Sequence, residues 1–197
     1  MLTELEIINE GLAAAGFARV GSLDSKHPAF RRAKNSFDII NTGIQARGWW
    51  FNRYVRTLTP DAEGKIVLPQ HALVVDTEGS KYIERGRYLI DGSTGSFNIG
   101  QNVCARIIEK LPVDVIPAPA QLFVAASVKF SFYADESGNE PKLSLYAQLA
   151  AQAENKLRVE HLKHENVNYF DGLSGSAVRY PHAHSSRGHH PLGRFFK

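Results

Sequence analysis

Apolar residues recur every three or four positions in four stretches of this 197-residue chain, a spacing that predicts amphipathic helices. The first helix is expected to start at Thr3, because Glu6 follows at the spacing of a capping box, and to stop at Gly16. The second is expected after Ser25, with Pro28 near its first turn. Its apolar stripe consists of Phe30, Ala33, Phe37, Ile40 and Ile44. The chain therefore opens as a helical hairpin.

The same period returns in the last third of the chain. A third helix is expected after residues 117–119, and it should end where residues 137–139 break the pattern. Its predicted face consists of Phe123, Ala126, Phe130 and Tyr133. A fourth and longest helix opens near Pro141, and Glu154 with Arg158 one turn later should face solvent. Its predicted stripe consists of Leu143, Tyr146, Ala150, Ala153 and Leu157.

Residues 49–110 have a different pattern, with aromatic and β-branched runs separated by glycines, which predicts a small antiparallel sheet. Residues 49–56 and 65–68 flank a turn and predict a hairpin. Other short strands are expected at residues 73–76, 81–84, 87–90 and 103–108. The expected fold class is α+β: a four-helix bundle of two N-terminal and two C-terminal helices, with this sheet inserted and an extended C-terminal arm. The expected parts are residues 1–48, 49–112, 113–171 and 172–197.

The charge is unevenly distributed along the chain. It carries 23 Lys and Arg against 20 Asp and Glu, for a formal net charge of +3. Residues 172–197 hold four of the cations and no acid, which leaves 19 cations against 20 acids in the rest. A body this close to neutral argues against a general nucleic-acid-binding surface.

The single cysteine, Cys104, excludes an intramolecular disulfide, so the fold needs no oxidising compartment. Because Cys104 lies in the predicted strand 103–108, it is expected in the core. The acidic N-terminus lacks the features of a secretory signal. The most apolar stretch, residues 113–128, is interrupted by Asp114 and by prolines, so no membrane insertion is expected. Assembly in the cytosol follows as the expectation.

Histidines gather in the arm and on the last helix, but they form no complete metal site. His182, His184, His189 and His190 have no nearby Cys, Asp or Glu to complete or orient one, so a polar or phosphate-contacting tail is the favoured interpretation. His161 and His164 are expected at the edge of a helix interface, with metal binding less favoured. No nucleophile elbow or paired general acid and base stands out. We therefore expect no catalytic site, no metal and no cofactor.

The arm, residues 172–197, has almost no aliphatic residues and cannot form its own core. It does combine cations with aromatic side chains, the residue types that dominate binding hot spots. The candidate anchors are Arg179, Tyr180, Arg187, Arg194, Phe195 and Phe196. We expect the arm to bind an acidic groove with apolar pockets.

The segment Gln-Ala-Arg-Gly-Trp-Trp-Phe-Asn at residues 45–52, at the end of the helical hairpin, resembles the signature of the tail tubular protein A family. These proteins are head-to-tail adaptors of short-tailed bacteriophages. Further matching segments follow in the same order at residues 58–61, 64–69, 76, 85–86 and 88–91. The resemblance covers roughly residues 2–171, and the histidine-rich arm departs from it.

This resemblance implies a structural virion protein of the tail, without enzymatic activity. Such proteins form a dodecameric ring beneath the portal protein, join it to the nozzle, and offer a docking surface for a tail fibre or spike. Packaged DNA passes through their channel without sequence-specific binding. The arm would then dock on the portal. Arg47, Trp49 and Asn52 would fix the angle between the helical and β parts, with Trp49 and Trp50 on opposite faces if a strand begins at residue 49.

Two other functions remain open at this point. A tail-associated cell-wall hydrolase would need two carboxylates about 5 to 10 Å apart in a cleft. A DNA-binding module acting through the basic arm would show binding that weakens with salt in proportion to its cations.

Overall fold

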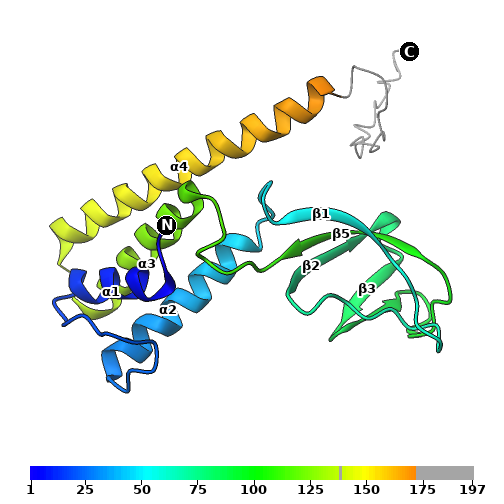
Figure 1. Ribbon diagram of the computed structural model, residues 1–197, viewed down its shortest axis with the longest axis horizontal. Coiled ribbons are helices and arrows are strands. Elements are labelled where there is room, and N and C mark those ends of the chain that lie inside the picture. The colour runs from blue at the N-terminus through cyan, green and yellow to red at the C-terminus, as the bar shows by residue number, and fades with distance from the viewer. Residues whose placement is uncertain (138, 172–197) are drawn as a thin grey trace, which may run out of the picture.

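The computed structural model describes residues 1–137 and 139–171, which form a helical part and a β part arranged end to end (Figure 1). The fold class is α+β. The helices are α1 (Glu4–Ala14), α2 (Pro28–Gln45), α3 (Ala118–Glu136) and α4 (Glu140–Asp171). The strands are β1 (Arg53–Leu58), β2 (Ala72–Thr77), β3 (Tyr82–Arg85), β4 (Tyr88–Asp91) and β5 (Val103–Glu109).

The two N-terminal helices begin as the sequence predicts. The Thr3 hydroxyl accepts a hydrogen bond from the Glu6 amide at 3.3 Å, and the Glu6 carboxylate accepts one from the Thr3 amide at 2.7 Å. This reciprocal pair confirms the capping box. Pro28 opens α2, where its fixed φ fits the first turn and its missing N–H is not needed. The predicted stripe of α2 is buried, apart from the half-buried Ile40.

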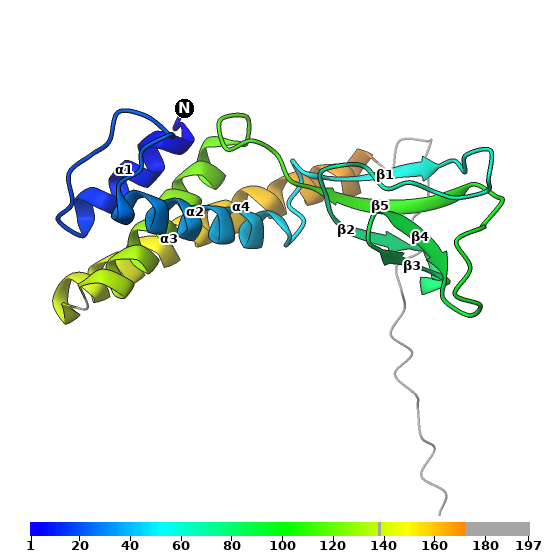
Figure 2. The same ribbon diagram turned by 90° about the horizontal axis from the view of Figure 1, so that it is seen from below.

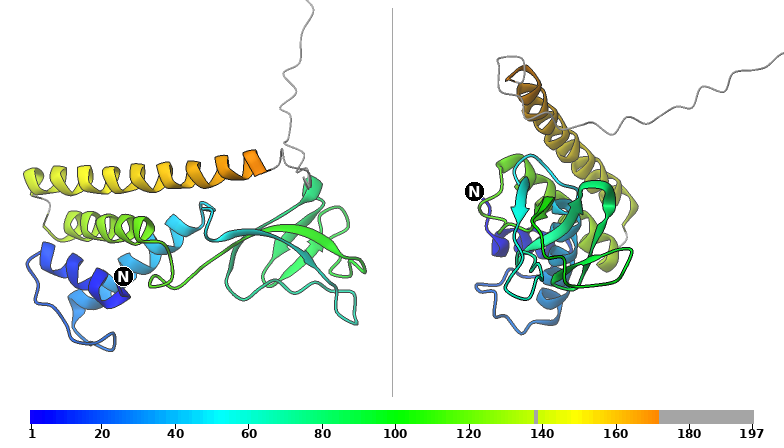
Figure 3. Two further views of the ribbon diagram at one scale, coloured as in Figure 1. Left: turned by 45° about the horizontal axis from the view of Figure 1, so that its top comes forward. Right: turned by 90° about the vertical axis from the view of Figure 1, so that its right-hand side faces the viewer.

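Helix α3 lies between α4 on one side and the α1–α2 pair on the other (Figure 3). Its predicted face is partly wrong, because Ala126 and Phe130 are only half buried. Val124, Val128 and Phe132 lie in the core instead. Since α3 packs against three other helices, apolar residues surround much of its circumference, and the helical period does not select one face.

Helix α4 packs against α3 through the predicted stripe, in which Leu157 is fully buried and the other members are half buried. The helix runs antiparallel to α3, continues past the N-terminal end of α3 and extends over the start of the β part (Figure 1). Over the described residues, no helix combines the length and the apolar character that crossing a bilayer requires.

The β part contains a three-stranded antiparallel sheet in the order β1-β5-β2, with β3 and β4 paired beside it (Figure 2). The predicted hairpin of residues 49–56 with 65–68 is wrong. β1 pairs with β5, and residues 65–68 contact β4 instead, through a bridge between Val67 and Tyr88. The strand also begins only at Arg53, because residues 50–52 form a turn.

The expectation that Cys104 is a core residue is also wrong. Its neighbours alternate in β5, with Val103, Ala105 and Ile107 facing the core. Successive side chains of a strand point to opposite faces, so Cys104 is exposed.

The buried apolar residues form two clusters. One lies in the β part and includes Leu89 and Ile107. The other lies in the helical part and combines residues from both ends of the described chain, from Ile7 of α1 to Leu157 of α4.

Candidate functional site

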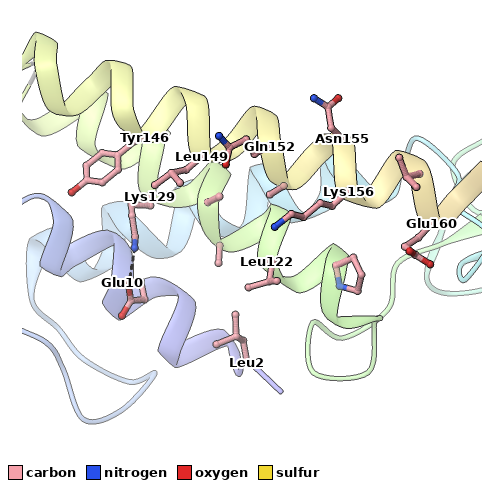
Figure 4. Close-up of a pocket in the computed structure, with 15 residues that line it drawn as sticks. Leu2, Glu10, Leu122, Lys129, Tyr146, Leu149, Gln152, Asn155, Lys156 and Glu160 are labelled. Carbon is pink, nitrogen blue, oxygen red and sulfur yellow. Dashed lines mark hydrogen bonds and ion pairs between the residues drawn. The ribbon is translucent and has the colours of Figure 1, made fainter.

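An open groove of about 810 Å³ runs along the helical part between α1, α3 and α4 (Figure 4). Its apolar side chains come mostly from α3 and α4, and Leu2 adds one from the N-terminal end. They are Leu2, Pro119, Leu122, Ala125, Ala126, Leu149, Ala153 and Val159. We call this surface the helical groove.

Large aliphatic side chains of the helical groove are exposed to solvent. Leu122 of α3 is 54% exposed, and Leu149 of α4 is 44% exposed. Val159 of α4, which also lines the groove, is exposed as well. A contiguous apolar surface of this kind usually marks a protein contact.

The charged residues that line the helical groove are Glu10, Lys129, Lys156 and Glu160, and three of these four are paired. The Lys129 ammonium donates to the Glu10 carboxylate at 2.8 Å, and this hydrogen bond holds the pKa of Glu10 below its ordinary value. Glu160 pairs with Lys163 at 2.7 Å. Lys156 has no ion-pair partner among residues 1–137 and 139–165. The groove is therefore suited to an apolar partner surface that brings an acid to Lys156.

A second candidate site lies where the helical part meets the β part. The Asn52 side-chain oxygen accepts a hydrogen bond from the Trp49 amide at 2.9 Å. Its side-chain amide donates to the carbonyls of Gln45 and Glu109, both at 2.9 Å. Asn52 thus joins the end of α2, the following turn and the end of β5 through one buried side chain.

Arg47 and Arg53 link this junction to α4. The Arg47 guanidinium lies 5.0 Å from the centre of the Trp49 ring and bonds the Glu154 carboxylate at 2.9 Å. The hydrogen bond from Arg47 is the main cause that lowers the pKa of Glu154. Arg53 bonds Glu165 at 2.6 Å and lowers the pKa of that carboxyl in the same way. The predicted junction residues Arg47, Trp49 and Asn52 therefore lie together.

Two contributors to the junction were not predicted from the sequence. Gln45 is fully buried, donates to the Leu111 carbonyl at 2.9 Å and accepts from the Leu111 amide at 2.8 Å. His164 stacks on Trp50 with ring centres 4.7 Å apart. The helix-edge interpretation of His161 and His164 gave no indication of these tryptophan partners, because the ring contacts join residues more than 100 positions apart in the chain.

His161 is the titratable group at the junction whose protonation is opposed by burial. Its ring meets Trp49 edge-on at 5.4 Å, and its Nδ1 is buried without a hydrogen-bond partner within the described ranges. Burial lowers the pKa of His161, and this effect is larger than the opposite effect of the Glu165 carboxylate 3.5 Å away, which raises the pKa. The positive charges of Arg53 and His164 lower it further.

This burial predicts a pH effect on stability. Because the folded state holds fewer protons at His161 than the unfolded state, the contribution of the neutral His161 ring to folding stability is complete above the unfolded pKa of 6.5. It should be lost as the pH falls through the lower folded value. Urea unfolding at pH 7.5 and 5.5 should show a loss of stability at the lower pH, and His161→Phe should reduce that loss. An equal pH effect in the His161 variant would contradict the assignment.

The other predicted sites lie outside the described residues. These are the six candidate arm anchors and the four histidines from His182 to His190. Within the residues that the structure describes, no three His, Cys, Asp or Glu side chains gather in a way that could hold a metal ion.

Comparison with known proteins gives two matches. A family model described as tail tubular protein matches residues 5–168. Tail tubular protein A of Klebsiella phage KP34 is 29% identical over 169 residues, which cover 85% of this chain and 91% of the relative. The span matched by the family model runs from α1 into the last turn of α4, so it contains the β part, the junction and nearly all of the helical groove.

Proposed function

Because the chain belongs to the tail tubular protein family, we propose that this bacteriophage tail protein forms the adaptor ring that joins the portal of the head to the tail nozzle. The family is structural rather than enzymatic. The proposal includes a dodecameric ring, a channel for packaged DNA and an outer surface for a fibre or spike.

The observation that carries this proposal is the exposed apolar helical groove. A closed ring repeats one contact between two different surfaces of each subunit. We assign the helical groove to one of them, with a second copy of the chain as its occupant. On the far side of α3 from α4, Ile39 of α2 is 64% exposed, and Asp38 lies beside it. An Ile39 side chain in the groove would bring Asp38 toward Lys156 of the neighbouring subunit.

The same contact would cover the side of α4 that faces the helical groove, since α4 packs mainly on α3 and leaves that side uncovered within one chain. The near-neutral charge of residues 1–171 suits a channel that lets DNA pass without binding it. In this proposal the arm docks on the portal through its six anchors. The junction at Arg47, Trp49 and Asn52 sets the angle between the helical ring and the β parts.

Replacing Leu122 with glutamate should abolish ring formation while leaving the subunit folded. Leu122 is mostly exposed in the single chain, so the charge has little effect on folding, but ring contact would bury the carboxylate against apolar side chains of the neighbouring subunit. Sedimentation and negative-stain electron microscopy should show at least tenfold fewer rings at equal concentration, with the thermal midpoint of the dissociated chain unchanged within a few degrees.

The matched control for this variant is Leu23→Glu. Leu23 is 43% exposed and does not line the helical groove, so its replacement should leave the rings intact. If the Leu122 variant formed rings as well as the parent chain, the groove would not be the subunit contact.

A further inference from the structure

The turn between β3 and β4 carries an exposed patch that combines cations with apolar side chains. It surrounds an open depression of about 570 Å³. We call it the hairpin patch, and its side chains are Lys65, Val67, Arg85, Arg87, Tyr88 and Phe97. None of these residues lines the helical groove.

Local backbone pairing turns the apolar members outward. The Leu68 amide donates to the Arg87 carbonyl at 2.8 Å, and the Leu89 amide donates to the Ile66 carbonyl at 3.1 Å. Ile66, Leu68 and Leu89 are buried, so the alternating positions Val67 and Tyr88 face solvent. Tyr88 and Phe97 meet edge to face with ring centres 5.9 Å apart, which gives the patch an ordered aromatic surface.

The arginines of the hairpin patch are available to a partner. Lys65 bonds the Glu63 carboxylate at 2.6 Å. Arg85 and Arg87 have no carboxylate within ion-pair distance in the part of the chain that the structure describes. Both are exposed and line the depression on either side of Gly86, whose φ of 63° is the left-handed conformation that this tight turn requires. Two such guanidinium groups favour carboxylates, which they can bind bidentately.

The composition around the hairpin patch favours a protein over a nucleic acid. Residues 49–112 carry eight Lys and Arg against seven Asp and Glu, so the β part has no broad positive field for a phosphate backbone. Exposed Val67, Tyr88 and Phe97 lie among the cations. Arginine beside exposed aromatic side chains is the composition typical of energetically important protein contacts.

We propose that the hairpin patch binds an acidic segment of another protein, whose carboxylates pair with Arg85 and Arg87 while an apolar side chain packs on Tyr88 and Phe97. This goes beyond the ring contact, because the hairpin patch lies on the β part. It does not depend on ring formation, so the two proposals succeed or fail separately.

The test measures fluorescence anisotropy of a labelled twelve-residue peptide in which aspartates alternate with phenylalanine and leucine, using the full chain at physiological salt. Arg87→Glu and Phe97→Ser should each weaken binding at least tenfold. The matched controls are Arg56→Glu and Val55→Ser on β1, which are exposed outside the patch and should change binding less than twofold. A peptide with asparagine in place of every aspartate should not bind.

Three results would overturn the proposal. The first is a peptide affinity that the patch variants do not change, or no affinity at all. The second is equal binding of the asparagine peptide. The third is a twelve-nucleotide single-stranded DNA that binds more tightly than the peptide and depends on the same residues, because the site would then be a nucleic-acid surface. Sedimentation of the same variants records ring formation independently.

Discussion

Replacing Phe37 with aspartate should unfold the helical part. Phe37 lies in the middle of α2 with 2% of its surface exposed and belongs to the apolar cluster of the helical part. The substitution removes an aromatic side chain from the core and leaves a carboxylate there, which together should cost about 4 kcal/mol or more. Since whole domains are stable by only roughly 5–15 kcal/mol, a loss of this size removes between about a quarter and most of the folding free energy.

The control is the same substitution by aspartate at Ile39, two residues further along α2. Ile39 is on the exposed face of α2, so Ile39→Asp should alter the unfolding free energy by only about 0.5 kcal/mol. Urea unfolding followed by circular dichroism, at a concentration where subunits are dissociated, measures both variants. Equal stability of the two would show that Phe37 is not a core residue.

Replacing Asn52 with alanine should destabilise the protein by about 3 kcal/mol. The variant leaves the Trp49 amide and the carbonyls of Gln45 and Glu109 without their Asn52 partner in a buried setting. Unsatisfied buried polar groups are costly because they lose hydrogen bonds to water without replacement. Because Asn52 joins α2 to β5, the β part should also change its position relative to the helices.

Asn35→Ala on the exposed side of α2 is the matched control and should be nearly neutral. Unfolding measures the stability of both variants. Small-angle scattering of the folded chain detects a changed angle between the two parts. An Asn52 variant that kept the parent's stability and scattering profile would disprove the structural role of the junction.

Local signals allowed much of the helical part to be predicted. Thr3 with Glu6 fixes the start of α1 by contacts three residues apart, and Pro28 marks the start of α2. The stripe on α4 was predictable because one side of that helix meets α3 and the other meets solvent. For α3 the same method failed, since neighbours on several sides remove the contrast between faces.

Distant contacts explain what could not be predicted. Strand pairing is set by which partner covers the core, and β1 pairs with β5 about fifty residues later in place of the nearby residues 65–68. The type and position of Asn52 suggested a junction, but its bond to Glu109 spans 57 residues. The helical groove was unpredictable for a related reason: exposure of Leu122 depends on where α4 lies, and no local pattern encodes that position.

Cryo-electron microscopy of the assembled full-length protein tests the central claim most directly. Our account predicts a closed ring in which the helical groove of each subunit is covered by its neighbour, with Leu122 and Leu149 buried at the contact and the β parts projecting from the helical ring. Particles that stayed monomeric at high concentration, or rings in which the helical groove remained open to solvent, would contradict it.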